Sequence, residues 1–238
     1  MEYATEIAEQ IAASPVLIQD VKLFNPQGGF TSFLIPAVLI LVVQQSLLLG
    51  VGTMTGSERD RRRKKLLVPV NKHFYHPLRV VLGKAFVYLA IYMVMSYWVF
   101  FIVPRLFNMT QVGMRGELML FLFPFLLACV FFAMTMSFLS QEREMPFLIF
   151  VFTSVPLMFI SGISWPKSAI PEYWVYFGKL FPSSYGIDGF VKMNNAGATL
   201  SDVWPEIQGL CILLCFYFIV AYLLYKNECK KLKVYNRK

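Results

Sequence analysis

The sequence predicts an all-α membrane protein. We expect five transmembrane helices, a short cytoplasmic helix, and an extracytoplasmic helical segment that is either re-entrant or interfacial. Apolar residues make up 57% of the 238 positions, whereas charged residues make up only 15%, against about 25% in soluble proteins. The apolar residues occur in blocks of about 20, the length that crosses a hydrocarbon core of roughly 30 Å. The net charge of +8 follows the loops between these blocks, so it does not indicate nucleic-acid binding.

The N-terminal residues 1–32 are polar to mixed, without the basic stretch and short apolar run of a signal peptide. A turn over residues 24–29 leads into the first apolar block. The five expected spans cover residues 33–54, 81–104, 118–139, 147–163 and 207–225.

The loop over residues 55–84 fixes the orientation of the chain. It holds nine Lys or Arg residues against two acids, Glu58 and Asp60, and short basic loops stay on the cytoplasmic side of a membrane. Two overlapping capping-box patterns, Thr55-x-x-Glu58 and Ser57-x-x-Asp60, predict that a helix begins here, and Pro69 and Pro77 end or redirect it. We expect a short basic helix at the inner membrane surface. It serves either as an orientation signal only or as a docking element for a cytoplasmic partner.

This orientation places 16 of the 22 Lys and Arg residues inside, which agrees with the positive-inside rule over the whole chain. The C-terminus is then cytoplasmic and the N-terminus extracytoplasmic. An outside N-terminus with no signal sequence and an odd number of spans suggests that an upstream span is missing, or that the first span inserts as a reverse anchor.

The outer segment over residues 164–206 is rich in Trp, Tyr, Phe and Pro. Trp and Tyr favour the headgroup level of a membrane, which is consistent with a helix lying on the surface. Irregular backbone can also enter the membrane where protein or water surrounds it, which is consistent with a re-entrant helix pair that closes the outer end of a pathway. The sequence leaves both interpretations open.

The chemistry of the chain excludes several classes of protein. The spans carry almost no ionisable groups beyond Lys84, with Gln44 and Gln45 as uncharged polar residues, which argues against an ion-driven carrier or an intramembrane protease. Neither the four cysteines nor the pair His73 and His76 forms a metal-binding pattern. The phosphate-binding pattern GxxxxGKS or GxxxxGKT is absent from the sequence. We therefore expect a non-enzyme without a cofactor, in which any energy source is a partner.

Four stretches stand in an order that resembles the membrane permease of a type-two ATP-binding-cassette (ABC) exporter. Each stretch is a pair or trio of short motifs: FNP at 24–26 with FLIP at 33–36; SERD at 57–60 with LLVP at 66–69 and LGK at 82–84; SGISWP at 161–166 with AIP at 169–171; and FPSSY at 181–185 with GA at 197–198 and DVW at 202–204. The resemblance covers residues 20–226. It departs from the family where RRRKK at 61–65 replaces the usual Gly-Thr after the acidic-basic start.

The resemblance implies a multi-pass subunit of a bacterial inner-membrane exporter for drugs, lipids or polysaccharides. Residues 1–30 would be the tail of an extracytoplasmic segment and 31–238 the permease domain. Two such permeases, identical or related, would sit above two ATPase subunits that hold ATP and Mg²⁺. The basic helix would be the coupling helix, in which Ser57, Glu58, Arg59, Asp60 and Pro69 meet the ATPase. The residues that would shape the outer gate are Gly162, Pro166, Pro171, Pro182 and Tyr185. The alternative is a non-transporting scaffold or sensor whose basic loop binds anionic lipid or a cytoplasmic partner.

Overall fold

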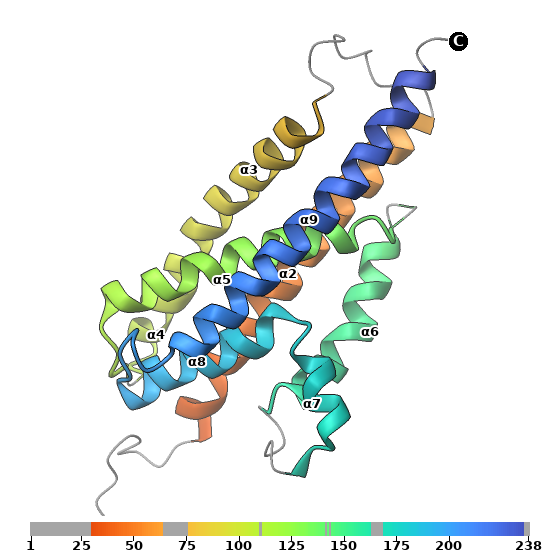
Figure 1. Ribbon diagram of the computed structural model, residues 1–238. Coiled ribbons are helices and arrows are strands. Elements are labelled where there is room, and N and C mark those ends of the chain that lie inside the picture. Colours follow the sequence, from red (N-terminus) through yellow and green to blue (C-terminus); the bar gives the residue numbers. More distant parts are fainter. Residues whose placement is uncertain are drawn as a thin grey trace, which may run out of the picture.

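A computed structural model describes residues 30–63, 76–109, 111–140, 142, 144–162 and 169–235. Every regular element among these residues is a helix, as the sequence predicts (Figure 1). In chain order the helices are α2 (Phe30–Arg63), α3 (Pro77–Tyr97), the π-helical turn η2 (Trp98–Ile102), α4 (Val103–Leu106), α5 (Arg115–Met136), α6 (Met145–Ile160), α7 (Glu172–Gly178), α8 (Pro182–Ala196) and α9 (Trp204–Tyr235).

Four of the helical segments are long and apolar enough to cross a membrane. They cover Leu34–Arg61, Pro77–Leu106, Arg115–Met136 and Trp204–Cys229, and each overlaps an expected span. The remaining expected span, over residues 147–163, corresponds to α6. This helix has 16 residues and is therefore about 24 Å long, which is shorter than the hydrocarbon core.

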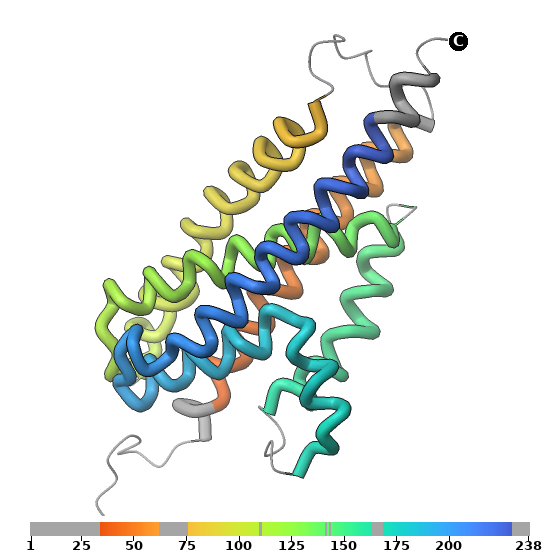
Figure 2. Tube along the Cα trace, viewed as in Figure 1, coloured from red at the N-terminus to blue at the C-terminus, as the bar shows by residue number. Residues whose placement is uncertain are grey.

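The helix ends lie in two groups, at opposite ends of the bundle, as the charge pattern predicts. The C-terminal ends of α2 and α9 and the N-terminal end of α3 lie at one end of the bundle, whereas the N-terminus of α2, α4 and the start of α9 lie at the other (Figures 1 and 2). We call the first the inner end, since α2 and α9 lead there into the basic segments, and the second the outer end. The segments expected on one side of a membrane thus lie together.

The expected start of a separate helix at Thr55 or Ser57 is wrong, because α2 runs without a break from Phe30 to Arg63; the rest of the expected helix, over residues 64–69, lies outside the described residues. A capping box starts a helix only where the preceding residues are not helical. Here the Thr55 hydroxyl donates instead to the carbonyl of Val51, 2.9 Å away, within the same helix. On the neighbouring face Gly52 packs so closely on Pro146 of α6 that a Cβ atom would not fit. Because of this packing, the helix of the first span continues without a break into the basic residues.

The core is centred on α5, which packs against α2, α3, α8 and α9. Twelve of its 22 residues are buried, and from Ala128 to Met134 every residue is buried, as in a helix surrounded by other elements. Phenylalanine fills much of this core: Phe121, Phe125 and Phe132 come from α5, Phe100 from η2 and Phe190 from α8. The expected outer segment contributes directly, because α8 lies inside the bundle.

Candidate functional site

The inner end of the bundle holds an ion pair between α2 and α3. The Lys84 ammonium donates to Glu58 Oε2 at 2.7 Å, and the two side chains are 23% and 35% exposed. The same ammonium lies 5.6 Å from the ring centroid of Tyr225 in α9. Glu58, for which the resemblance implies a contact with the ATPase, thus has a partner inside the chain.

Arg59 contacts two further parts of the inner end. Its Nη1 donates to the carbonyl oxygens of Ser140 at 2.7 Å and of Phe138 at 3.3 Å, both just after the end of α5. A positive charge there is favourable, because the C-terminal end of a helix carries partial negative charge. Its Nη2 lies 3.7 Å from a carboxylate oxygen of Glu228 in α9, and the guanidinium covers the ring of Phe138 at 5.0 Å. Arg59 therefore fixes α2 to the α5–α6 connection and to α9.

We call Glu58, Arg59, Lys84, Tyr225 and Glu228 the inner-end cluster. Among the other coupling residues that the resemblance implies, Ser57 and Asp60 are partly exposed on the same helix, and Pro69 lies outside the described residues. The sequence did not predict that Lys84 and Glu228 belong to this site. They lie 26 and 169 positions from Glu58 and Arg59, and only their opposite charges could have suggested the pairing.

The outer-gate residues that the resemblance implies divide between two turns. Gly162 follows α6 with a φ of 81°, a left-handed conformation in which glycine is the least strained residue. Pro171 precedes α7, and Pro182 opens α8 at a position where a missing N–H does no harm. The ring of Tyr185 covers Gly209 of α9 so closely that a Cβ atom there would overlap it. Pro166 lies outside the described residues.

The turn between α7 and α8 lies at the side of the bundle, part of the way along its length (Figure 1). The amide of Ser183 donates to Gln44 Oε1 of α2 at 2.6 Å, and the Tyr217 hydroxyl of α9 donates to the Leu180 carbonyl at 2.8 Å. Gln44 lies about 15 Å along α2 from Leu34, and Tyr217 about 20 Å along α9 from Trp204, at 1.5 Å per residue. The turn thus reaches between a third and a half of the way along these two spans. This geometry favours the re-entrant interpretation for α8.

The helix α7 differs from α8 in its exposure. Its side chains Tyr173, Trp174, Tyr176 and Phe177 are all exposed, whereas nine of the 15 residues of α8 are buried. The two helices of the hairpin thus differ in their surroundings: α7 presents aromatic side chains at its surface, and α8 packs against α2, α5 and α9.

Polar side chains in the middle of α2 contact both the hairpin and α6. Gln44 is 1% exposed and also accepts a weak bond from the Cys129 thiol of α5, 3.8 Å away. Gln45 is 2% exposed and bonds the Thr153 hydroxyl of α6 at 3.3 Å. These two glutamines, which the sequence singles out only as uncharged, join α2 to α5, α6 and α8.

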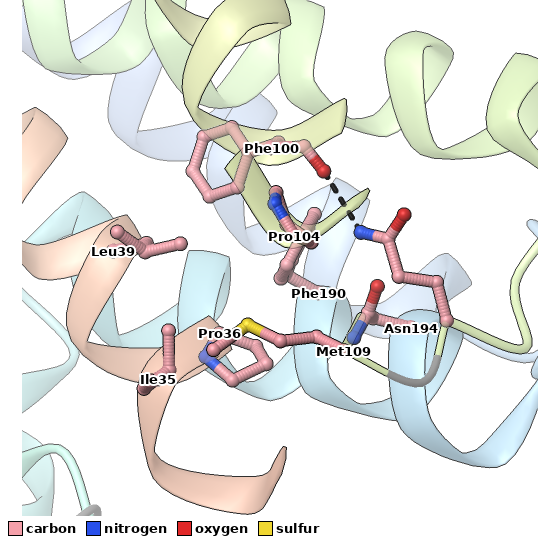
Figure 3. A pocket seen from close by; sticks show the side chains of 9 residues that line it. Ile35, Pro36, Leu39, Phe100, Pro104, Met109, Phe190 and Asn194 are labelled. Carbon is pink, nitrogen blue, oxygen red and sulfur yellow. Dashed lines mark hydrogen bonds between the residues drawn. The ribbon is translucent and has the colours of Figure 1, made fainter. Parts of the chain in front are cut away.

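A small pocket lies at the outer end between α2, η2, α4 and α8 (Figure 3). Its walls include Leu39, Phe100 and Phe190, and the Gln111 amide beside it donates to the Phe100 carbonyl at 2.8 Å. The enclosed space is about 10 Å³, enough for roughly one water molecule. It is too small for an organic cargo. In the described part of the chain, no group of three or more His, Cys, Asp or Glu side chains could hold a metal ion.

Four candidate spans and a helical hairpin that enters the bundle from the outer end define a multi-pass membrane protein. Residues 2–223 match the model of the ABC-2 family transporter protein, and the chain belongs to this family. It is thus a membrane permease subunit of the kind that works with an ABC ATPase. None of the curated proteins compared with the chain matches it.

Proposed function

We propose that this permease subunit exports a hydrophobic or amphipathic cargo from the cytoplasm, and that a separate ATPase beneath its inner end drives the movement. The observation that carries the proposal is the inner-end cluster, in which the basic end of α2 is fixed to α3, α5 and α9 at one place. A force on this end of α2 acts on all three neighbours together. Two permeases, identical or related, would form the complete membrane part.

The helix α2 also supplies a route for movement to the outer side. It is continuous from Arg59 to Gln44, a distance of about 22 Å along the axis at 1.5 Å per residue. Gln44 holds the amide of Ser183 at the start of α8. Because a regular helix transmits a displacement along its axis, a shift of the inner end would move the α7–α8 hairpin. We infer that Pro171, Pro182 and Tyr185 position this hairpin as the outer gate.

The inner-end geometry changes which residue should meet the ATPase. Glu58, Arg59 and Asp60 are all partly exposed, but Glu58 and Arg59 are also engaged in ion pairs with α3 and α9. We therefore propose Asp60, with Ser57, as the direct contact, and Glu58 and Arg59 as residues that pass the movement to the bundle. The basic residues 61–65 that follow would supply charge for the same surface.

The test is co-purification of the tagged chain in mild detergent from a host that also expresses the neighbouring genes. We expect a stoichiometric ATPase with measurable ATP turnover, and we expect Asp60→Lys to release it while the melting temperature of the permease stays unchanged. Ser154→Ala is the matched control, because this hydroxyl bonds the carbonyl of Phe150 within α6, far from the inner end of α2.

A chain that purifies without any nucleotide-binding partner would contradict the proposal. Binding of the same chain to vesicles containing anionic lipid, and loss of this binding on neutralising residues 61–65, would then favour the scaffold or sensor. Export is tested separately, by comparing cargo in right-side-out and inside-out vesicles supplied with ATP.

A further inference from the structure

The turn between α7 and α8 contains a charged residue, Lys179, at a level part of the way along the spans. Lys179 and Leu180 are both exposed in the single chain, and Leu180 is 48% exposed. Yet the Leu180 carbonyl accepts its hydrogen bond from Tyr217, which lies half way along the α9 span. The aromatic ring of Phe181 packs on Phe132 of α5, with the centroids 5.7 Å apart. These contacts place Lys179 well below the outer ends of the spans.

Lys179 has no carboxylate within ion-pair distance among the residues that the structure describes. Its ammonium lies instead over the ring of Tyr176, 5.1 Å from the centroid. The lysine side chain can extend along α7 toward the outer surface, but the Tyr176 ring is only one turn away. About 20 Å separates the level of Tyr217 from Trp204 at the outer end of α9. Extension by one helical turn therefore does not bring the charge to the headgroup layer.

A lipid surface does not suit this position. Charged side chains within membrane spans face protein or a water-filled space, and irregular backbone at this depth requires the same surroundings. The α7–α8 turn has both features on its exposed side. Something other than hydrocarbon must therefore cover Lys179 in the membrane.

A second copy of the chain offers no counter-charge at this depth within the described residues. The described acids on the long helices lie near the helix ends: Glu58, Asp60 and Glu228 at the inner end, and Glu117 and Glu206 at the outer end. Asp188 in α8 is the exception, and it lies close enough to Tyr185 and Lys192 to influence both. Among the described residues of the long helices, no acid therefore lies at the right depth to pair with Lys179 of a second copy.

We propose that the exposed side of the α7–α8 turn lines a water-filled route through the assembled transporter, and that Lys179 attracts anionic groups there, such as the phosphate, sulfate or carboxylate of an amphipathic cargo. The proposal deepens the proposed export function, since it names the charge class of the cargo and one residue that binds it. The positive charge favours anions over cations at a place where the protein supplies few other charges.

The test measures the reaction of Leu180→Cys with an anionic and a cationic methanethiosulfonate reagent in membrane vesicles, after the four native cysteines are replaced by alanine. Leu180 suits the test because its backbone carbonyl, rather than its side chain, binds Tyr217. We expect both reagents to react. We also expect Lys179→Gln to lower the anionic rate and raise the cationic rate by about fivefold each, as for one unit charge a few ångströms away in water, so that the ratio of the anionic to the cationic rate falls by roughly 25-fold.

The matched control is Phe216→Cys, which is next to Tyr217 at the same depth on the exposed side of α9. We expect this lipid-facing cysteine to react at least tenfold more slowly with both reagents, since charged reagents do not enter hydrocarbon. If Leu180→Cys lowers the melting temperature, Tyr176→Cys tests the same side, because the ring of Tyr176 lies beneath the Lys179 ammonium.

Equal, slow reaction at positions 180 and 216 would overturn the water-filled route. Fast reaction at position 180, with a ratio of anionic to cationic rate that Lys179→Gln does not change, would overturn the anion preference. Neither measurement requires ATP or cargo movement, so they fail independently of the proposed function. Fast, charge-sensitive labelling in a chain without an ATPase partner would leave the route in place and remove the export interpretation.

Discussion

At the scale of single residues, the side chain of Gln111 donates to the Phe100 carbonyl, to which Pro104 has no N–H to donate. In a regular helix the N–H of residue 104 would donate to the carbonyl of Phe100, but proline has no N–H. Here the helix widens into a π-helical turn at Trp98–Ile102, and the side chain of Gln111 donates to the Phe100 carbonyl at 2.8 Å. Phe100 is fully buried, so water cannot replace this donor.

We expect Gln111→Leu to lower the free energy of unfolding by about 1–3 kcal/mol, because it leaves a buried carbonyl without a partner. Thermal unfolding in detergent measures the change. In a Pro104→Ala background the restored backbone N–H can serve the same carbonyl, so the loss should fall below roughly 1 kcal/mol. An equal loss in both backgrounds would show that Gln111 stabilises the outer end in some other way.

The inner-end cluster shows how far a sequence specifies a site. Composition, caps and resemblance pointed to Glu58 and Arg59, and both lie at an ion-pair site in the structure. Their partners Lys84 and Glu228 could not be predicted, because the pairing depends on how α2, α3 and α9 pack against one another. The sequence shows how many charged residues there are, but it does not show which of them form ion pairs.

At the scale of elements, small residues let α8 enter the bundle. A Cβ atom at Gly186 would overlap the ring of Phe125, and one at Gly189 would overlap the ring of Phe121. Both rings are fully buried in α5 and have little room to move in a close-packed interior. The two glycines are three residues apart and lie on the same face of α8. They therefore set how closely α8 approaches α5.

We expect Gly189→Ala to destabilise the protein by about 1–3 kcal/mol through overpacking. Gly83→Ala is the matched control, because this glycine is also helical and has open space where the Cβ would lie. The control should be neutral or stabilise the protein by up to about 1 kcal/mol, since alanine favours a helix. Equal melting temperatures for the two variants would contradict the close approach of α8 and α5.

The turn before α9 is fixed by one exposed carboxylate. Asp202 accepts hydrogen bonds from the Thr199 amide at 2.9 Å and from the Thr199 hydroxyl at 2.8 Å. The Thr199 amide and then its hydroxyl lower the pKa of Asp202 below its ordinary value of 3.8. Because the pKa is lower in the folded than in the unfolded protein, this contribution to stability is present above the unfolded pKa.

We therefore expect Asp202→Ala to lower the melting temperature at pH 7. The difference from the unchanged protein should shrink as the pH falls below about 4, where protonation removes the same contribution. Thermal unfolding at several pH values measures this difference. Ser201→Ala, in the same exposed turn, serves as a control without a titrating group. A difference that stays constant down to pH 3 would contradict the role of the carboxylate charge.

The lengths of the elements were only partly visible in the sequence. Hydropathy located the apolar part of α2. The helix nevertheless continues through Thr55, where the sequence predicted the start of a new helix, because Gly52 packs against Pro146 and the Thr55 hydroxyl bonds the Val51 carbonyl within α2. In the outer segment, the Trp and Tyr content indicated an interfacial helix and the prolines a re-entrant pair. In the structure α7 is exposed and α8 is largely buried, a difference that depends on where α2, α5 and α9 lie.

At the scale of the whole molecule, the charge pattern predicted which segments share an end of the bundle. That prediction depends on counting lysines and arginines, and it needs no knowledge of packing. The depth of the α7–α8 turn depends instead on three contacts far apart in sequence: Gln44 with Ser183, Tyr217 with Leu180, and Phe132 with Phe181. Long-range contacts of this kind leave no local pattern, which is why the hairpin's position required the structure.

The inner-end cluster makes a prediction about how the assembled transporter works. Glu58→Lys alone places two like charges at the contact between α2 and α3, where the structure has an ion pair of 2.7 Å. We expect it to reduce both the melting temperature and export. Lys84→Glu alone should have the same effect, by creating a pair of carboxylates. Each single change should cost about 1 kcal/mol or less, because the pair is partly exposed.

The double variant Glu58→Lys with Lys84→Glu restores opposite charges at the same contact. We expect it to recover most of the stability and most of the export, since Glu58 acts through its partner on α3 and not by touching the ATPase. Melting temperature and ATP-driven uptake into inside-out vesicles measure the two effects. Recovery of stability without recovery of export would show that Glu58 also contacts the ATPase, and the direct contact would then extend from Asp60 to Glu58.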